Sequence, residues 1–146
     1  MEVNMSFDRL DIKDNTTKEG RACIIICNLG GKELKTVKNC ASILGIRDQI
    51  VLYSKNGDSI IKDILENNIN SECEEGRREK AIIFNALSQA KINLLIENLR
   101  RLRMNNVLKA VVTDTSINWS INEVISNLVA ERTAINNGNF TDQHEK

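Results

Sequence analysis

The feature that most constrains the fold of this 146-residue chain is an internal repeat. Residues 21–69 contain an apolar run, a segment with helical spacing, a second apolar run and a second helical segment, and residues 79–132 contain the same four elements in the same order. The matched apolar runs are Ile24–Asn28 with Ala81–Asn85, and Ile50–Tyr53 with Ala110–Thr113. A repeat is considered before other patterns because overlooking it leads to the wrong fold.

The four apolar runs predict strands, and the segments between them predict helices. The runs are short, continuous and rich in β-branched residues, which is typical of strands buried on both faces of a parallel sheet. Apolar residues recur at helical spacing between Ile92 and Leu102, and Ser88 is a suitable N-cap for that helix. Strands that alternate with helices indicate an α/β protein with a (βαβα)₂ organisation.

One unit of about 50 residues buries too little apolar surface to be stable alone, so we expect both units to share one four-stranded sheet. We predict a small, doubly wound, mainly parallel sheet with helices on both faces. If crossovers are right-handed and a two-fold axis along the strands relates the units, the strand order is 2-1-3-4.

The same patterns predict the domain organisation. We expect a single α/β domain over residues 21–132, with a polar linker at residues 70–78 between the two units. Residues 1–20 are expected to be flexible and residues 133–146 to form a disordered tail, because both segments carry few apolar anchors.

The predicted sheet points to one candidate ligand site. Ligands of open parallel α/β sheets bind beyond the carboxyl ends of the strands, where the strand order reverses. That point lies between the first and third strands, and a ligand there would meet Asn28, Gly30, Gly31, Asn85 and Ser88. The glycines suit either a phosphate-binding turn or a simple tight turn, and the asparagines suit either a ligand or the loop backbone.

A second candidate site is the polar loop that follows the last strand. It contains Asp114, Thr115 and Asn118 and ends in Trp119, the single tryptophan. Such a loop can recognise a small ligand through hydrogen bonds, with the indole as a stacking wall. The alternative is that Trp119 packs against the core while its neighbours cap the following helix.

Composition excludes several classes of function. Twenty Lys and Arg balance twenty Asp and Glu, so neither nucleic acid nor an anionic membrane is favoured as a partner. The chain has a single His, and beyond Asp114 no general base lies near the predicted crevice, so we predict no catalytic residue, metal or cofactor. The apolar runs are too short to span a membrane.

The cysteines and the start of the chain bear on location. Four cysteines without a CxxC pair, and no leader-like apolar segment at the start, predict a cytoplasmic protein with reduced thiols.

Residues 80–132 also carry a family resemblance. The stretches that carry it are Ile82–Ser88, Leu94–Leu99 and Lys109–Thr115, followed by Trp119. They resemble a bacterial family described as domain of unknown function 3783. That family tends to have Gly at the position of Ala86 and Pro-Thr-Asn in place of Asp114–Ser116. The resemblance supports the fold of the second unit and implies no known activity.

These observations favour a non-enzymatic binding or regulatory module that acts through protein association. Both predicted edge strands are apolar enough to invite pairing, so a homodimer or a complex with a partner protein is expected. The alternative is a protein that binds a small ligand, nucleotide or phosphate, or a small enzyme, at the crevice between the first and third strands.

Overall fold

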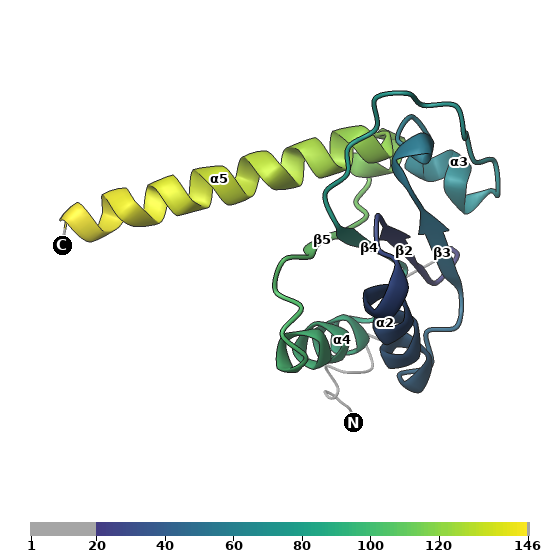
Figure 1. Ribbon diagram of the computed structural model, residues 1–146, viewed down its shortest axis with the longest axis horizontal. Coiled ribbons are helices and arrows are strands. Elements are labelled where there is room, and N and C mark those ends of the chain that lie inside the picture. Colours follow the sequence, from purple (N-terminus) through teal and green to yellow (C-terminus); the bar gives the residue numbers. More distant parts are fainter. Residues whose placement is uncertain (1–19, 146) are drawn as a thin grey trace.

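The sheet has the predicted strand order and carries helices on both faces. A computed structural model describes residues 20–145, with side chains described as far as residue 135. The strands are β2 (Cys23–Cys27), β3 (Gln49–Leu52), β4 (Ala81–Asn85) and β5 (Leu108–Val111). They lie in the order β3-β2-β4-β5, which confirms both the order 2-1-3-4 and the α/β class (Figure 1).

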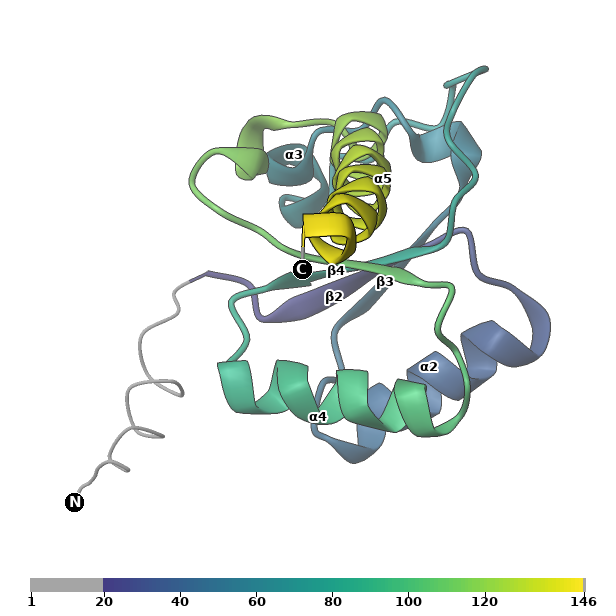
Figure 2. The same cartoon turned by 90° about the vertical axis from the view of Figure 1, so that its left-hand side faces the viewer.

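Two helices cover each face of the sheet. The helices are α2 (Gly31–Ile43), α3 (Ile61–Leu65), α4 (Gln89–Arg101) and α5 (Ile121–Glu145), and the short turns η1 (Ser54–Asn56) and η2 (Ser116–Asn118) precede α3 and α5. Helices α2 and α4 lie on one face, and α3 and α5 lie on the other (Figure 2). No helix in residues 20–145 is long and apolar enough to cross a membrane.

Helix α5 is the longest element, and it continues beyond the edge of the sheet past β5 (Figure 1). It includes residues 133–145, which the sequence predicted to be a disordered tail. The predicted flexible segment 1–20 lies outside the described residues, except for Gly20.

The prediction of a mainly parallel sheet was wrong, because the central pair of strands is antiparallel. β2 pairs with β3 in parallel and β4 with β5 in parallel, whereas β2 and β4 run in opposite directions. The reason lies in the connection between the units. After the short α3 the chain returns to the end of β3, where the Cys73 N–H donates to the Lys55 carbonyl at 3.0 Å. β4 therefore begins at the end of the sheet where β2 and β3 finish.

The position of the central strands between two helical layers explains why their sequences are apolar without interruption. Every residue of β2 is buried. Ile24 and Ile26 pack under α2 and α4, whereas Ile25 and Cys27 pack under α3 and α5. Because successive side chains of a strand point to opposite faces, a strand between two helical layers needs apolar residues at every position.

We predict that Ala86→Gly stabilises the protein. Ala86 has φ 56°, a left-handed conformation that costs a residue with a Cβ about 1–2 kcal/mol. The greater freedom of Gly in the unfolded chain offsets about 0.5–1 kcal/mol of this gain. The free energy of unfolding, measured by urea denaturation, should therefore rise by about 0.5–1 kcal/mol.

The matched control is Ala130→Gly, because Ala130 is exposed in the middle of α5. There the same chemical change should lower the free energy of unfolding by about 1 kcal/mol. Equal destabilisation by both variants would show that Ala86 is not strained.

Candidate functional site

The structure does not form the predicted crevice between the ends of the first and third strands. In the antiparallel pairing of β2 with β4, Cys23 lies opposite Asn85. Asn28 follows the other end of β2, so Asn28 and Asn85 lie at opposite ends of the sheet. Their convergence depended on a parallel central pair, and the antiparallel pair separates them.

Each of these asparagines holds the chain segment that leads into the neighbouring central strand. The Asn28 Nδ2 donates to the carbonyls of Arg77 at 3.1 Å and Glu79 at 2.8 Å, just before β4. The Asn85 Nδ2 donates to the carbonyl of Arg21 at 2.8 Å, just before β2. In this structure both amides therefore satisfy loop backbone, which was the alternative interpretation of their sequence positions.

The remaining residues of the predicted crevice begin helices. Gly30 is the N-cap of α2, and Gly31 adopts φ 54° as its first residue. Ser88 caps α4, where its Oγ accepts from the Lys91 N–H at 3.2 Å. Helices α2 and α4 follow antiparallel strands, so the two helix starts are also separated. Ligand binding at any of these residues individually stays a prediction.

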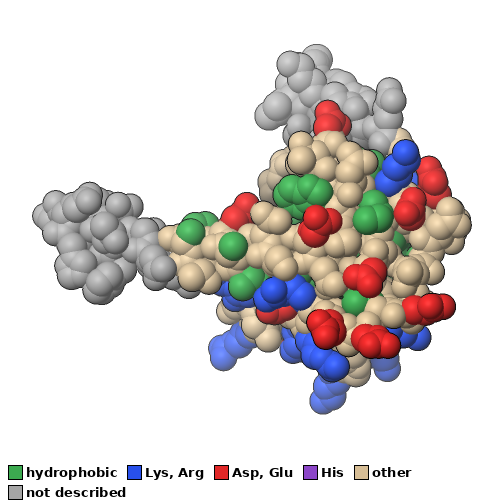
Figure 3. Space-filling model, turned by 90° about the horizontal axis from the view of Figure 1, so that it is seen from above, with side chains coloured by type: hydrophobic (Ala, Val, Ile, Leu, Met, Phe, Trp, Pro, Cys, Tyr) green, Lys and Arg blue, Asp and Glu red, His purple; other side chains and the backbone are tan. Residues whose placement is uncertain are grey.

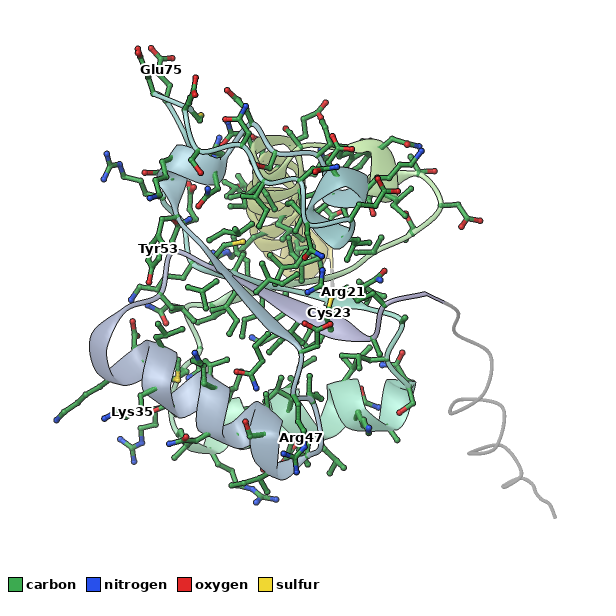
Figure 4. The ribbon with its side chains drawn as sticks, turned by 90° about the vertical axis from the view of Figure 1, so that its right-hand side faces the viewer. Arg21, Cys23, Lys35, Arg47, Tyr53 and Glu75 are labelled. Atoms are coloured by element: carbon green, nitrogen blue, oxygen red, sulfur yellow. The ribbon has the colours of Figure 1, made fainter. Side chains whose placement is uncertain are left out.

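An ion pair between Arg21 and Asp48 lies at the end of the sheet where β2 begins. Arg21 donates to both carboxylate oxygens of Asp48, at 2.6 and 3.0 Å, and its Nη1 donates to the Leu65 carbonyl at 3.2 Å. The hydrogen bond from Arg21 holds the pKa of Asp48 below its usual range. This stabilisation is present above the pKa of the unfolded-state carboxyl and is lost as pH falls through the lower folded-state value. Figure 4 shows Arg21 beside the buried Cys23.

The polar loop after β5 is organised by hydrogen bonds within itself. The Ser116 N–H donates to the Thr113 Oγ1 at 3.0 Å, and the Thr113 N–H donates to the Ser116 Oγ at 2.9 Å. The side chains of Asp114, Thr115 and Asn118 are exposed. Trp119 is half-buried and packs against the core beneath α3 and α5. The loop therefore does not gather its polar side chains around one point.

A cavity of about 340 Å³ lies between β5, this loop and α5. Its lining residues are Ile61, Ile83, Lys109, Ala110, Val111, Val112, Thr113, Ser116, Trp119, Val124, Asn127, Leu128 and Glu131. Of the predicted site residues, only Trp119 is among them. Its volume falls within the range of pockets that bind small molecules or large side chains.

The walls of the cavity are mainly apolar, with a few polar groups around them. Lys109 contributes from the sheet, and its Nζ donates to the Val107 carbonyl at 2.9 Å. Burial is the main cause that lowers the pKa of Lys109, and the nearby positive charge of Arg132 lowers it further. Apolar walls with a few fixed polar groups are typical of a binding pocket.

The buried thiols lie outside this cavity. Burial raises the pKa of Cys23 to about 11 and that of Cys27 to about 12, which suppresses the reactive thiolate. Within residues 20–135, no group of three or more His, Cys, Asp or Glu is placed to hold a metal ion.

The cavity is continuous with the free edge of the sheet. The Leu108 N–H donates to the Lys80 carbonyl at 2.8 Å, and the Val112 N–H donates to the Phe84 carbonyl at 2.9 Å. The backbone of the even-numbered residues of β5 therefore bonds to β4. The backbone groups of Lys109 and Val111 consequently point away from the sheet. Among the described residues no strand pairs with this outer side of β5. Lys109 and Val111 also line the cavity, so one surface offers both a pocket and free backbone groups.

Sequence reasoning identified the edge strand but missed the wall contributed by α5. Residues 110–113 were recognised as an apolar edge that invites pairing. Asn127, Leu128 and Glu131 carried no signal beyond ordinary helical spacing, because their role depends on α5 lying across β5. The exposed edge was detectable in the sequence, whereas the position of the last helix across that edge was not.

The fold and the cavity define a small α/β protein with a mainly apolar cavity at the edge of its sheet. Residues 80–135 match the model of the family described as domain of unknown function (DUF3783), which is less than half of the chain. The match confirms the resemblance, and it covers β4, α4, β5 and the first part of α5. Neither the curated proteins nor the solved structures gave a match to the chain.

We predict that Asn85→Ala destabilises the fold. The change leaves the part-buried carbonyl of Arg21 without its donor, which should lower the free energy of unfolding by about 1–3 kcal/mol. Asn118→Ala is the control, because Asn118 is an exposed asparagine of the other predicted site, and it should change stability by less than about 0.5 kcal/mol. Urea denaturation of both variants measures the difference. Wild-type stability in Asn85→Ala would contradict a structural role for this amide.

Proposed function

We propose that this protein is a non-enzymatic binding module that takes an extended segment of a partner polypeptide along β5. The single observation that carries the proposal is the continuity of the cavity with the free backbone groups of Lys109 and Val111. A strand added to a sheet edge gains affinity from main-chain hydrogen bonds and specificity from pockets that receive alternate side chains. The cytoplasm remains the proposed location.

The surroundings of β5 favour a strand over a free small molecule. A small ligand in the cavity would leave the outward N–H and C=O groups of Lys109 and Val111 to solvent. An added strand would pair with them and place every second side chain on the face covered by α5. One large apolar side chain would then enter the cavity beside Trp119, and Val111, which is 41% exposed, would be covered.

We also infer that the chain arose by internal duplication, with both halves contributing to one sheet. The central register supports this, because Ile25 lies opposite Ile83 and Ile26 lies opposite Ile82. A second reciprocal contact supports it on the α3 and α5 side. There the Ile61 N–H donates to the Trp119 carbonyl, and the Ile121 N–H donates to the Ser59 carbonyl, both at 2.9 Å. In this view the family match covers one of two equivalent halves.

We predict that Val111→Pro abolishes strand binding without unfolding the protein. The Val111 N–H points outward, so proline removes a donor from the edge and no hydrogen bond from the sheet. Val51→Pro is the matched control on β3. The Ile24 N–H donates to the Asp48 carbonyl and the Asn28 N–H donates to the Leu52 carbonyl. The backbone groups of the odd-numbered residues of β3 therefore also point outward.

The probe is a short capped peptide of alternating threonine and valine with one central leucine, and binding is followed by the fluorescence of Trp119. The wild-type protein and Val51→Pro should bind it with a change in emission, whereas Val111→Pro should not. Ala110→Leu partly fills the cavity, so it should weaken the binding of the leucine peptide more than the binding of a peptide with a central alanine. Loss of binding only in Val51→Pro would assign the function to the other edge. A stable wild-type dimer that Val111→Pro dissociates would replace the partner strand with a second copy of this chain.

A further inference from the structure

The zero net charge of the chain conceals two layers of opposite charge. Residues 29–48 and 86–107, which contain α2 and α4, carry eight Lys or Arg and three Asp or Glu. We call this the basic layer. Residues 53–80 and 112–135, which contain α3 and the described side chains of α5, carry six Lys or Arg and ten Asp or Glu. The sheet separates this acidic layer from the basic one.

The figures show this separation directly. Lys35 and Arg47 project from the α2 side of the sheet, whereas Glu75 lies at the tip of the linker on the opposite side (Figure 4). The view onto the α5 face shows acidic side chains spread over that surface, with most Lys and Arg along the lower rim and others at the upper right (Figure 3).

The few acidic residues of the basic layer do little to neutralise it. Glu33 pairs with Lys80 at 2.6 Å, and Asp48 pairs with Arg21 at 2.6 Å. Both cations come from outside the layer, so these two carboxylates are already neutralised. Glu97 forms ion pairs with Arg100 and Arg101 of its own helix.

The basic layer also exposes aliphatic side chains. Ile43 at the end of α2 is 82% exposed, Leu94 in α4 is 51% exposed, and Leu102 directly after α4 is 52% exposed. Helices α2 and α4 pack side by side and antiparallel, because each returns along one of two antiparallel strands (Figure 2). The exposed apolar side chains are therefore distributed along a two-helix surface among basic residues.

We propose that the outer face of the basic layer binds the surface of an anionic lipid bilayer. Lys and Arg are attracted to acidic headgroups, and isolated Leu and Ile side chains gain by insertion at the boundary between headgroups and acyl chains. Nucleic acid fits less well, since exposed aliphatic side chains contribute nothing to phosphate binding. The described aromatic residues, on which bases could stack, lie outside this face, with Tyr53 after β3, Phe84 buried and Trp119 in the acidic layer.

The opposite charge of the two layers would orient the protein on the bilayer. An anionic surface attracts the basic layer and repels the acidic one, so the β5 cavity beneath α5 would face away from the lipid. The prediction from composition disfavoured such a surface because it used the net charge alone. The proposal rests instead on where the charges lie, and it does not require the strand-binding function.

The test is co-sedimentation of the full chain with vesicles of phosphatidylcholine alone or mixed with phosphatidylglycerol. We expect binding only to the mixed vesicles and weaker binding at higher salt. Lys35→Gln combined with Arg101→Gln should reduce partitioning about 25-fold, at about fivefold for each charge. Leu94→Gln should reduce it about fivefold. The emission of Trp119 should not change, because that residue lies in the acidic layer, away from the bilayer.

The controls are Lys62→Gln, which removes one positive charge, and Ile69→Gln, which removes one aliphatic side chain, both at exposed positions of the acidic layer. Both should bind the mixed vesicles as the wild type does, and circular dichroism should show that all variants are folded. Absent binding, equal binding to both vesicle types, or equal loss in the controls would each overturn the proposal. Tighter binding to a duplex DNA oligonucleotide, unaffected by Leu94→Gln, would assign the face to nucleic acid instead.

Discussion

The antiparallel pairing of β2 with β4 is the contact on which the rest of this structure depends. Each half of the chain has only two strands and two helices, and neither half could bury enough apolar surface alone. Pairing at the centre buries both faces of β2 and places one helix of each half on each side of the sheet. The amides of Asn28 and Asn85 hold the chain at the two ends of this pair.

The direction of that pairing also decides where a function could reside. A parallel central pair would have brought Asn28 and Asn85 together at one crevice. The antiparallel pair separates them, and a cavity lies instead at the outer edge, where α5 crosses β5. It also puts α2 and α4 together on one face, so that their basic residues form a single layer. The two proposed surfaces are therefore consequences of one choice of strand direction.

Some parts of the structure could be predicted from the sequence because they depend on local chemistry. Ser88 caps α4, as its position before that helix predicted. The apolar edge at residues 110–113 was also visible, since a strand pattern at the end of a predicted order must have a free side. The contributions of Asn127 and Glu131 were not visible, because a cavity wall depends on the angle at which a helix crosses a strand.

The sequence by itself determined the main strands and helices and their order along the chain, because these follow from side-chain periodicity. The strand order 2-1-3-4 followed only once a two-fold relation between the halves was assumed. Only the tertiary structure decided the direction of β4 relative to β2. That direction depends on where the linker carries the chain, and contacts such as that of Cys73 with Lys55 fix its path. Hydrophobic periodicity is the same for a strand read in either direction, so it carries no information about parallel or antiparallel pairing.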